Sequence, residues 1–331
     1  MGVGRYLQFV LGTCSSEDWL VDYRAFTSGK EDPLADVQSP WLRSVLLMIP
    51  LMSLPTLLCF AAECIVYAFL VWCGLNNVLS TVTLVALLSI LQFMIFTPGH
   101  DSAHGSVSSN SFINGLVGRL SFEFMGPIAV FAGWRFLHLQ HHKFTNHPDR
   151  DPDKYACGGP TFLLPLRWFT TIAQYVVFLL NSLDGGEVTL AEKVECVVDL
   201  TLNLLVCVLS YDFGCFYQVY YYWILPSFFC HGLLVFFFDF LPHYRHHTTP
   251  VEDRYQTTSN IETYSFLEPL LTAFLHYQNY HMIHHLHPKI PFYRYKAKWN
   301  SRVEELKERG CPKLIWKLSK QNDWKTTKKE E

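Results

Sequence analysis

Residues 138–142 read His-Leu-Gln-His-His, and the pattern returns at 281–285 as His-Met-Ile-His-His. A related cluster, His-Asp-Ser-Ala-His, occupies residues 100–104. On a helix, side chains three and four positions apart are neighbours. Each pair at i and i+4 can therefore present two imidazoles to one point, while the extra histidine of the longer clusters is rotated by about 100° and can reach a second point. The spacing predicts a site for two metal ions.

Chance does not account for these clusters. A single histidine pair at helical spacing is common on protein surfaces, but two copies of a five-residue pattern with three histidines are unusual. The clusters together hold more imidazoles than one ion accepts, so two ions are predicted. Imidazole suits zinc, copper, iron and nickel, whereas structural zinc needs four ligands and usually includes cysteine. Iron is the metal expected if the site activates O2.

Apolar stretches set the fold class. The chain is 50% apolar, and 17% of its 331 residues are charged, a balance that suits a membrane protein with a substantial polar part. A hydrocarbon core about 30 Å thick needs roughly 20 residues of apolar helix. Four stretches approach this length and are joined in pairs by short turns: 55–73, 78–97, 194–211 and 217–240. We predict an all-α membrane protein, with four transmembrane helices in two hairpins and a cytosolic helical cap that holds a histidine-ligated di-iron site.

Charge placement predicts the orientation. None of the 26 Lys and Arg residues lies in the turns at 74–77 and 212–216. Because cytosolic loops are enriched in basic residues, both turns are predicted outside and both termini in the cytosol. The final residues, Lys328-Lys329-Glu330-Glu331, are typical of a dilysine retrieval signal. They favour the endoplasmic reticulum membrane, with a plastid membrane as the alternative.

Three further apolar stretches are not assigned as spans. Residues 118–133 are too short and broken, and 41–54 are ambiguous. Residues 168–183 lie between the two blocks that carry the histidines, 100–147 and 243–287. If this stretch crossed the membrane, the two blocks would lie on opposite faces. We therefore expect 168–183 to lie along the interface.

The order and spacing of the three clusters, separated by paired apolar helices, resemble the histidine boxes of the membrane fatty acid desaturase and hydroxylase superfamily. The resemblance covers residues 40–300, and the boxes are a highly specific signal. It implies two Fe ions, O2 as co-substrate, and a further ligand, His243, just after the fourth helix. It also divides the chain into a cytosolic N-terminal segment (1–40), a desaturase-like domain (41–300) and a charged cytosolic tail (301–331). The implied metal ligands are His100, His104, His138, His141, His142, His243, His281, His284 and His285.

Three residues are candidates to support these ligands without binding metal. Asp239 lies four residues before His243, at the position where acyl-CoA desaturases carry an Asn, and Asp101 lies inside the first cluster. Such carboxylates offset the charge of the ions and orient imidazoles. Helix capping is the alternative for Asp101. Asn279, just before the third cluster, is the remaining candidate.

Other polar residues near the clusters are expected to be structural. The acids Asp149, Asp151 and Asp153 are expected to cap and tether the loop after the second cluster. His231 is expected to be a buried polar residue that needs a partner. Four further histidines lie outside the ligand set: His246, His247, His276 and His287. The first two are expected to contact the ligands without binding metal or to be solvated, and the last two to be structural or on the surface.

The resemblance implies an oxidoreductase that introduces a double bond into a fatty acyl chain of a lipid. A hydroxylase of a lipid or carotenoid ring is the alternative, because the segment from His142 to Asn146 and Leu241-Pro242-His243 also resemble β-carotene ring hydroxylases. A zinc-binding membrane transporter or receptor is the non-enzyme alternative. No His-Pro-Gly-Gly haem motif is present, so the electrons are expected from a separate donor, cytochrome b5 or ferredoxin. No basic stripe with spaced aromatic residues indicates a nucleic-acid partner.

Overall fold

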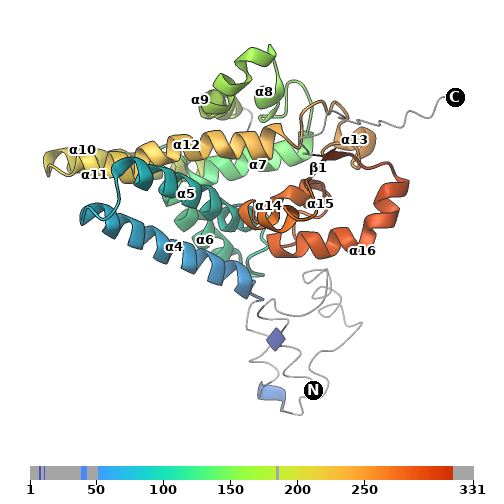
Figure 1. Cartoon of the computed structure of the whole chain (residues 1–331), viewed down its shortest axis with the longest axis horizontal. Coiled ribbons are helices and arrows are strands. Elements are labelled where there is room, and N and C mark those ends of the chain that lie inside the picture. The colour runs from blue at the N-terminus through green and yellow to red at the C-terminus, as the bar shows by residue number, and fades with distance from the viewer. Residues whose placement is uncertain (1–6, 9–10, 12–38, 43–50, 184–185, 316–331) are drawn as a thin grey trace.

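The computed structural model describes residues 7–8, 11, 39–42, 51–183 and 186–315. Its long helices form two hairpins, and they run in similar directions across Figure 1. The first hairpin is α4 (Leu54–Leu75) and α5 (Thr81–Ala103). The second pairs α10 (Leu190–Asp212) with a continuous helical segment of α11 (Phe216–Val219), the π-helix η2 (Tyr220–Ile224), α12 (Leu225–Leu234) and the π-helix η3 (Val235–Phe240).

Local sequence explains where these helices begin. The Ser80 hydroxyl accepts a hydrogen bond from the Thr83 backbone N–H (3.2 Å), and so satisfies a free donor at the start of α5. Thr189 and Glu192 form a reciprocal capping box at the start of α10. Helix α5 continues six residues beyond the apolar stretch expected at 78–97, through Pro98, and this continuation carries the first histidine cluster.

The remaining elements form a cap around the histidine-bearing ends of the long helices; in Figure 1, α13 to α16 lie at one end of the hairpins, whereas α6 and α7 lie alongside the long helices. Its longer helices are α6 (Ser111–Glu123), α7 (Phe131–Phe144), α14 (Glu268–Phe274), α15 (His281–Leu286) and α16 (Tyr295–Glu308). The parallel pair β1 (Asn260–Glu262) and β2 (Lys313–Ile315) ties the chain after α16 to the cap. The proposed tail boundary at 300 therefore falls inside α16. Short helical turns complete the cap: α8 (Lys154–Cys157), η1 (Thr161–Leu163), α13 (Pro250–Asp253), η4 (Gln278–Tyr280) and η5 (Phe292–Arg294).

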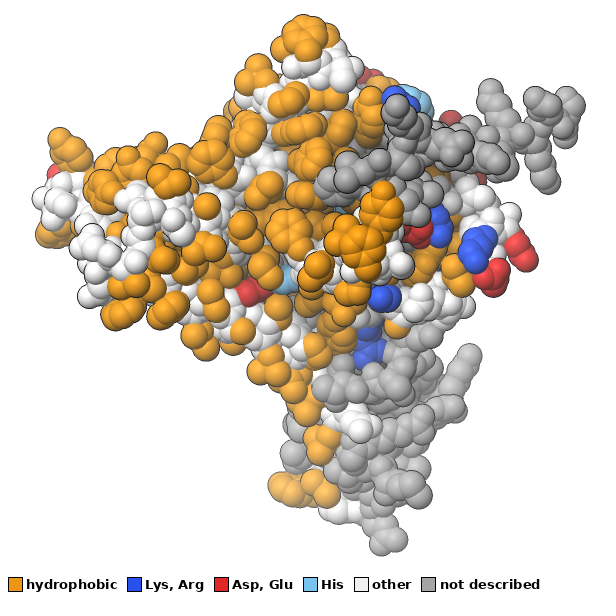
Figure 2. Space-filling view, viewed as in Figure 1, with side chains coloured by type: hydrophobic (Ala, Val, Ile, Leu, Met, Phe, Trp, Pro, Cys, Tyr) orange, Lys and Arg blue, Asp and Glu red, His pale blue; other side chains and the backbone are white. Residues whose placement is uncertain are grey.

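Within the described residues, five segments are long and apolar enough to cross a membrane. They are the two hairpins and α9 (Leu164–Ser182) with the turn η1 before it. Helix α10 turns most of its apolar side chains outward, and Leu204, for example, is 64% exposed. Figure 2 shows apolar side chains over the surface of the long helices, with most visible charged side chains over the cap. Such a surface suits lipid and not water, so the chain is an all-α membrane protein.

Aromatic side chains fill the space between the hairpins where they meet the cap. The ring of Phe93 on α5 stacks on Phe238 and on Phe274, with both centroid distances at 5.2 Å. Phe96, one turn later, packs edge-on to Trp134 of α7 at 5.1 Å. Gly126, with φ +92°, lets the turn between α6 and α7 approach Ser227 so closely that a Cβ would clash with its hydroxyl. This packing fixes the ends of α5 and α7 that carry histidines.

Candidate metal centre

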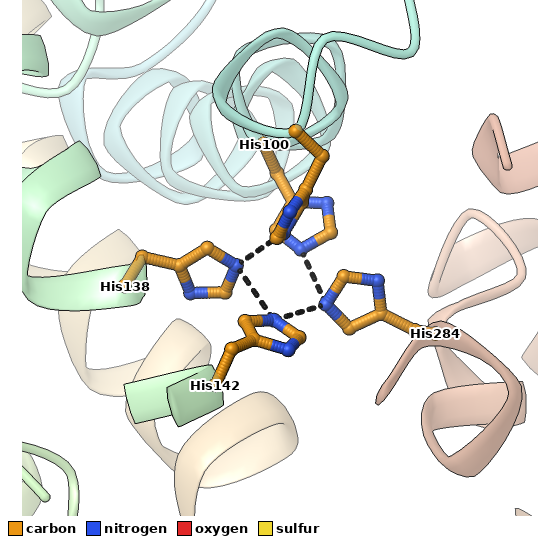
Figure 3. A group of neighbouring side chains, drawn as sticks. His100, His138, His142 and His284 are labelled. Atoms are coloured by element: carbon orange, nitrogen blue, oxygen red, sulfur yellow. Dashed lines mark hydrogen bonds between the residues drawn. The ribbon is translucent and has the colours of Figure 1, made fainter. Parts of the chain in front are cut away.

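The nine histidines expected as ligands converge in the cap as two groups. In each group, one ring nitrogen of every member lies within 4.8 Å of the others. The first group has five members: His100, His104, His138, His142 and His284. Figure 3 labels all of them except His104. The second group has four: His141, His243, His281 and His285. The structure thus brings all nine together from α5, α7, α15 and the turn after η3.

The nitrogens of each group are spaced as metal ligands are. Two imidazole nitrogens bound at about 2.1 Å and at a right angle to one ion lie about 3.0 Å apart. In the first group, His284 Nε2 lies 3.0 Å from His100 Nε2 and 2.8 Å from His142 Nε2. In the second, His281 Nε2 lies 3.0 Å from His243 Nε2 and 3.1 Å from His285 Nε2. Nitrogens that point at one another in this way leave a common point for an ion.

The five-residue clusters divide between the two groups as helical geometry requires. His138 and His142, at i and i+4 on α7, join the first group, whereas His141 joins the second. The third cluster is arranged the other way round, because its i and i+4 pair joins the second group and His284 joins the first. Each of α7 and α15 therefore contributes to both groups and holds them side by side.

Burial keeps most of these imidazoles neutral. Desolvation, followed by repulsion between neighbouring imidazoles, lowers the pKa far below its usual range for His104, His138, His142, His243, His281, His284 and His285. A neutral imidazole carries the lone pair that binds a metal, whereas imidazolium does not. The site is therefore prepared to bind cations at neutral pH.

His141 differs because two carboxylates face it. Its Nδ1 lies 2.8 Å from Asp151 Oδ1 and 3.2 Å from Asp153 Oδ2. Burial would lower the pKa of His141, but Asp153 and Asp151 outweigh burial and raise that pKa to about 9. Since Nδ1 donates to the carboxylates, Nε2 faces the second group, where a metal would displace its proton. The two acids therefore contact a candidate ligand as well as the loop, and their position just after the second cluster is the sequence signal for this contact.

The loop after α7 is also tethered as expected. The Asn146 side-chain amide donates to the backbone carbonyls of Thr248 (2.9 Å) and Thr257 (2.7 Å). Asp151 accepts from the Asn146 backbone N–H at 2.6 Å. This loop therefore joins the second cluster to the segment after His243.

The three candidate supporting residues are placed differently from one another. Asp101 Oδ1 lies 3.8 Å from His100 Nδ1, and its Oδ2 accepts from the Phe292 backbone N–H at 3.1 Å. Asp239 pairs with the Tyr175 hydroxyl (3.0 Å), which also donates to Asp153 (2.6 Å). The Asn279 amide donates to Thr272 (3.1 Å) and Glu268 (3.2 Å). Their support of the ligands stays a prediction.

Other side chains also orient the ligands or fill structural roles. Tyr295 OH lies 3.0 Å from Nδ1 of His284, and Gln278 Nε2 lies 3.3 Å from Nδ1 of His100. His246 is buried and bonds Gln256 O and Ser259, whereas His247 is exposed. His231 Nδ1 donates to the Ser227 carbonyl, the partner that it was expected to need. His287 bonds Arg302.

A small enclosed space touches both groups. A cavity of about 30 Å³ is lined by His100 and His138 of the first group, by His141 and His281 of the second, and by apolar and polar neighbours: Phe96, Trp134, Leu137, Asp153, Tyr175, Phe238, Asp239 and Gln278. A larger open groove of about 810 Å³ is lined by His104 and His142, with Arg119, Arg135 and Lys289 on its walls. The two groups thus border a small inner cavity and a larger groove that is open to solvent.

The shared site limits the number of membrane crossings. The chain leaves it at His142 and returns at His243, so it crosses the membrane an even number of times between them. At most two of the three apolar segments in that interval can therefore cross. Helix α9 lies outside the row of long helices in Figure 1 and packs on α7 and α12. The four-span count stays a prediction.

The predicted topology is testable with two tags. A glycan acceptor sequence built at Asn76, in the exposed turn after α4, is expected to be glycosylated because that turn is predicted to face the lumen. A tag after residue 331 is expected to be digested by protease added to intact vesicles. If the tag is protected until the vesicles are opened, the orientation is wrong. A matched acceptor sequence in the exposed part of α16 should remain unmodified.

The family model described as "Fatty acid desaturase" matches residues 75–314 of this sequence. The chain belongs to the fatty acid desaturase family. The match covers all nine histidines and every long helix of the two hairpins except most of α4.

Curated relatives include enzymes for two substrate classes. Omega-3 fatty acid desaturase fat-1 of Caenorhabditis elegans is 29% identical over 242 residues, 62% of this chain and 56% of that protein. Beta-carotene ketolase of a Paracoccus species is 29% identical over 215 residues, 62% of this chain and 74% of the relative. The sn-1 acyl-lipid omega-3 desaturase (ferredoxin) of a Nostoc species is 39% identical over 88 residues, 26% of this chain and 23% of the relative. The chain spans little more than half the length of the nematode desaturase.

Proposed function

We propose that this desaturase-family protein is an O2-dependent di-iron oxidoreductase that introduces a double bond into a fatty acyl chain of a lipid. The observation that carries the proposal is the convergence of nine histidines, from four separate segments, in adjacent groups of five and four. The membrane-type surface of the hairpins supports a lipid substrate.

The donor set fits iron. Five and four nitrogens leave positions open on ions that take roughly six ligands, and O2 chemistry requires open positions. A structural zinc site would be closed with four ligands and would usually contain sulfur, but neither group includes a cysteine. Neutral imidazoles do not offset the positive charge of the ions. Four nearby carboxylates can offset it: Asp101, Asp151, Asp153 and Asp239.

The residues around the groups have separate tasks in such a reaction. When bound, the two irons would supply the O2-dependent oxidation that removes hydrogen from an unactivated methylene, which acid–base side chains cannot do. The ring of Trp134 stacks on His138 at 4.6 Å and keeps water from that side of the ligand. Phe96 and Phe238 line the small cavity and offer apolar surface to an acyl chain. Asp151 and Asp153 hold the proton of His141 on Nδ1.

The electron donor is proposed to be a separate protein, cytochrome b5 in the endoplasmic reticulum or ferredoxin in a plastid. The open groove is the most accessible approach to the site, because its walls include two ligands, His104 and His142. Arg135 and Lys289 give this groove a basic rim, which favours a donor with an acidic surface. The name of the Nostoc relative specifies ferredoxin.

Oxidation of a carotenoid ring is the second candidate function. It is favoured by the β-carotene ketolase match, which covers 74% of that relative. Both functions need the same site, and they differ in the substrate placed against it. The transporter hypothesis needs ionisable groups along one path, but the contacts of Glu63 are to Cys59 and His276, and those of His231 are to Ser227.

Product profiling decides among these functions. We expect cells that make the full chain with a compatible electron donor to accumulate a lipid acyl chain with one added double bond. Cells that also make β-carotene should show no oxidised carotenoid. Oxidised carotenoid with unchanged acyl chains would replace the first function by the second. If neither product forms and the purified protein holds no iron, the enzyme hypothesis is wrong.

A further inference from the structure

A third cluster of metal-binding residue types lies outside the histidine centre. Cys59 and Glu63 are one turn apart on the same face of α4, and His276 approaches them from the turn after α14. One ligand atom from each lies within 4.8 Å of the other two. Glu63 is 6% exposed and His276 is 8% exposed, whereas Cys59 is partly buried, so the cluster is largely shielded but still reachable by water.

An unusual backbone turn places His276 there. His276 and Tyr277 have φ of +45° and +62°, in the left-handed region that residues with side chains rarely adopt. The Tyr277 backbone N–H donates to the Thr272 carbonyl at 2.8 Å and closes the end of α14. The His276 ring stacks on Phe292, with centroids 5.5 Å apart. These contacts aim Nε2 at Glu63.

The spacing of the atoms fits a tetrahedral ion. With zinc–ligand distances of about 2.3 Å to sulfur and 2.0–2.2 Å to nitrogen and oxygen, tetrahedral geometry puts S and O about 3.6 Å apart and N and O about 3.4 Å apart. The observed distances are 3.4 Å from Cys59 Sγ to Glu63 Oε1 and 3.6 Å from His276 Nε2 to Glu63 Oε1. The second of these is too long for a hydrogen bond.

Hydrogen bonding and charge also favour an ion. Among the described residues, Glu63 Oε2 is buried without a hydrogen-bond partner, which is costly for a carboxylate oxygen in an apolar setting and would be offset by a cation bound to that carboxylate. Burial lowers the pKa of His276 to about 4, so its imidazole is neutral. A thiolate, a carboxylate and a neutral imidazole around a divalent cation carry no net charge, and such a group can be buried in the membrane stem.

We propose that Cys59, Glu63 and His276 bind one zinc-type divalent cation, separate from the histidine centre, with its fourth position left to water. The ion fixes helix α4 to the turn five residues before His281. It thereby joins a membrane helix to the segment that carries the third histidine cluster. This site depends neither on iron in the histidine centre nor on the enzymatic function.

The thiolate distinguishes this site from the histidine centre in a cobalt experiment. Co²⁺ bound through a thiolate gives a sulfur-to-cobalt charge-transfer band in the near ultraviolet, and the nine-histidine centre has no sulfur ligand. The full chain, purified, stripped of metal and loaded with Co²⁺, is expected to show this band. Cys59→Ser should abolish it, and His276→Gln should weaken it with Cys59 still in place. Cys64→Ser, on the same helix but outside the cluster, is the matched control and should keep it.

Metal content gives an independent measurement. Protein purified with its native metals is expected to hold about one more zinc per chain than Cys59→Ser, with equal iron in the two. The proposal is overturned if the wild-type protein shows no thiolate band, if the band survives Cys59→Ser, or if Cys64→Ser removes it equally.

Discussion

Replacing His142 by alanine is expected to abolish product formation while the protein still inserts into membranes. His142 Nε2 lies 2.8 Å from His284 Nε2 and 3.2 Å from His138 Nε2, so it sits in the middle of the first group. Loss of a residue that merely orients a metal ligand typically costs 10–100-fold in affinity or activity. Loss of a ligand should cost at least as much, so we expect product to fall by about a hundredfold or more, together with iron content.

The measurement is product formed per membrane-inserted protein, with iron determined in the same preparation. His104→Ala and His285→Ala should behave alike, because each removes one nitrogen from a group. The matched control is His247→Ala, which removes an exposed histidine from the segment just after His243 and should leave activity unchanged. Product at the wild-type level in His142→Ala would remove that residue from the ligand set. An equal loss in His247→Ala would point to general misfolding.

The histidine clusters could be predicted from sequence because their geometry is local. Spacings of three and four residues fix which side chains share a helical face, and this relation survives whatever the helix packs against. The division of His138, His141 and His142 between the two groups follows from that spacing alone. Long apolar runs are equally local signals, and they placed both hairpins of the membrane stem.

Asp239 shows where this local argument stops. Its spacing of four from His243 suggested one continuous helical face, but the chain forms a π-helix at Val235–Phe240, and a further turn precedes His243. Each π-turn takes one more residue than an α-turn, so a spacing of four no longer places both side chains on one face; Asp239 bonds Tyr175 and lines the small cavity beside His141 and His281. The apolar sequence around Asp239 contains no signal that predicts the π-helix.

Helix α5 shows a different limit. Proline in a helix removes one hydrogen bond and usually ends or kinks the helix, and Pro98 follows directly after the apolar stretch at 78–97. In the structure the helix passes through Pro98 and carries His100, because the residues around it are fully packed. Tertiary packing of this kind outweighs local propensity, and it depends on segments far away in the chain.

Asp151→Ala tests the one supporting contact that the structure shows most directly. Asp151 Oδ1 accepts from His141 Nδ1 (2.8 Å), and its Oδ2 accepts from the Asn146 backbone N–H (2.6 Å). Without this carboxylate, the imidazole of His141 loses the acceptor that keeps its proton on Nδ1 and its Nε2 directed at the second group. We expect a 10–100-fold loss of activity, with lower iron occupancy. Activity and iron per inserted protein are the measurements.

Asp149→Ala is the matched control, because Asp149 is exposed and lies two residues earlier on the same loop. The activity of Asp151→Asn should fall between those of Asp151→Ala and Asp149→Ala. Its amide oxygen can still accept from His141, but its amide NH2 group would face the Asn146 backbone N–H, which needs an acceptor. Full iron and full activity in Asp151→Ala would contradict the orienting role of Asp151. Asp153, 3.2 Å from the same nitrogen, would then be sufficient to orient His141. In that case the double variant, Asp151→Ala with Asp153→Ala, should lose the activity and iron that each single variant retains.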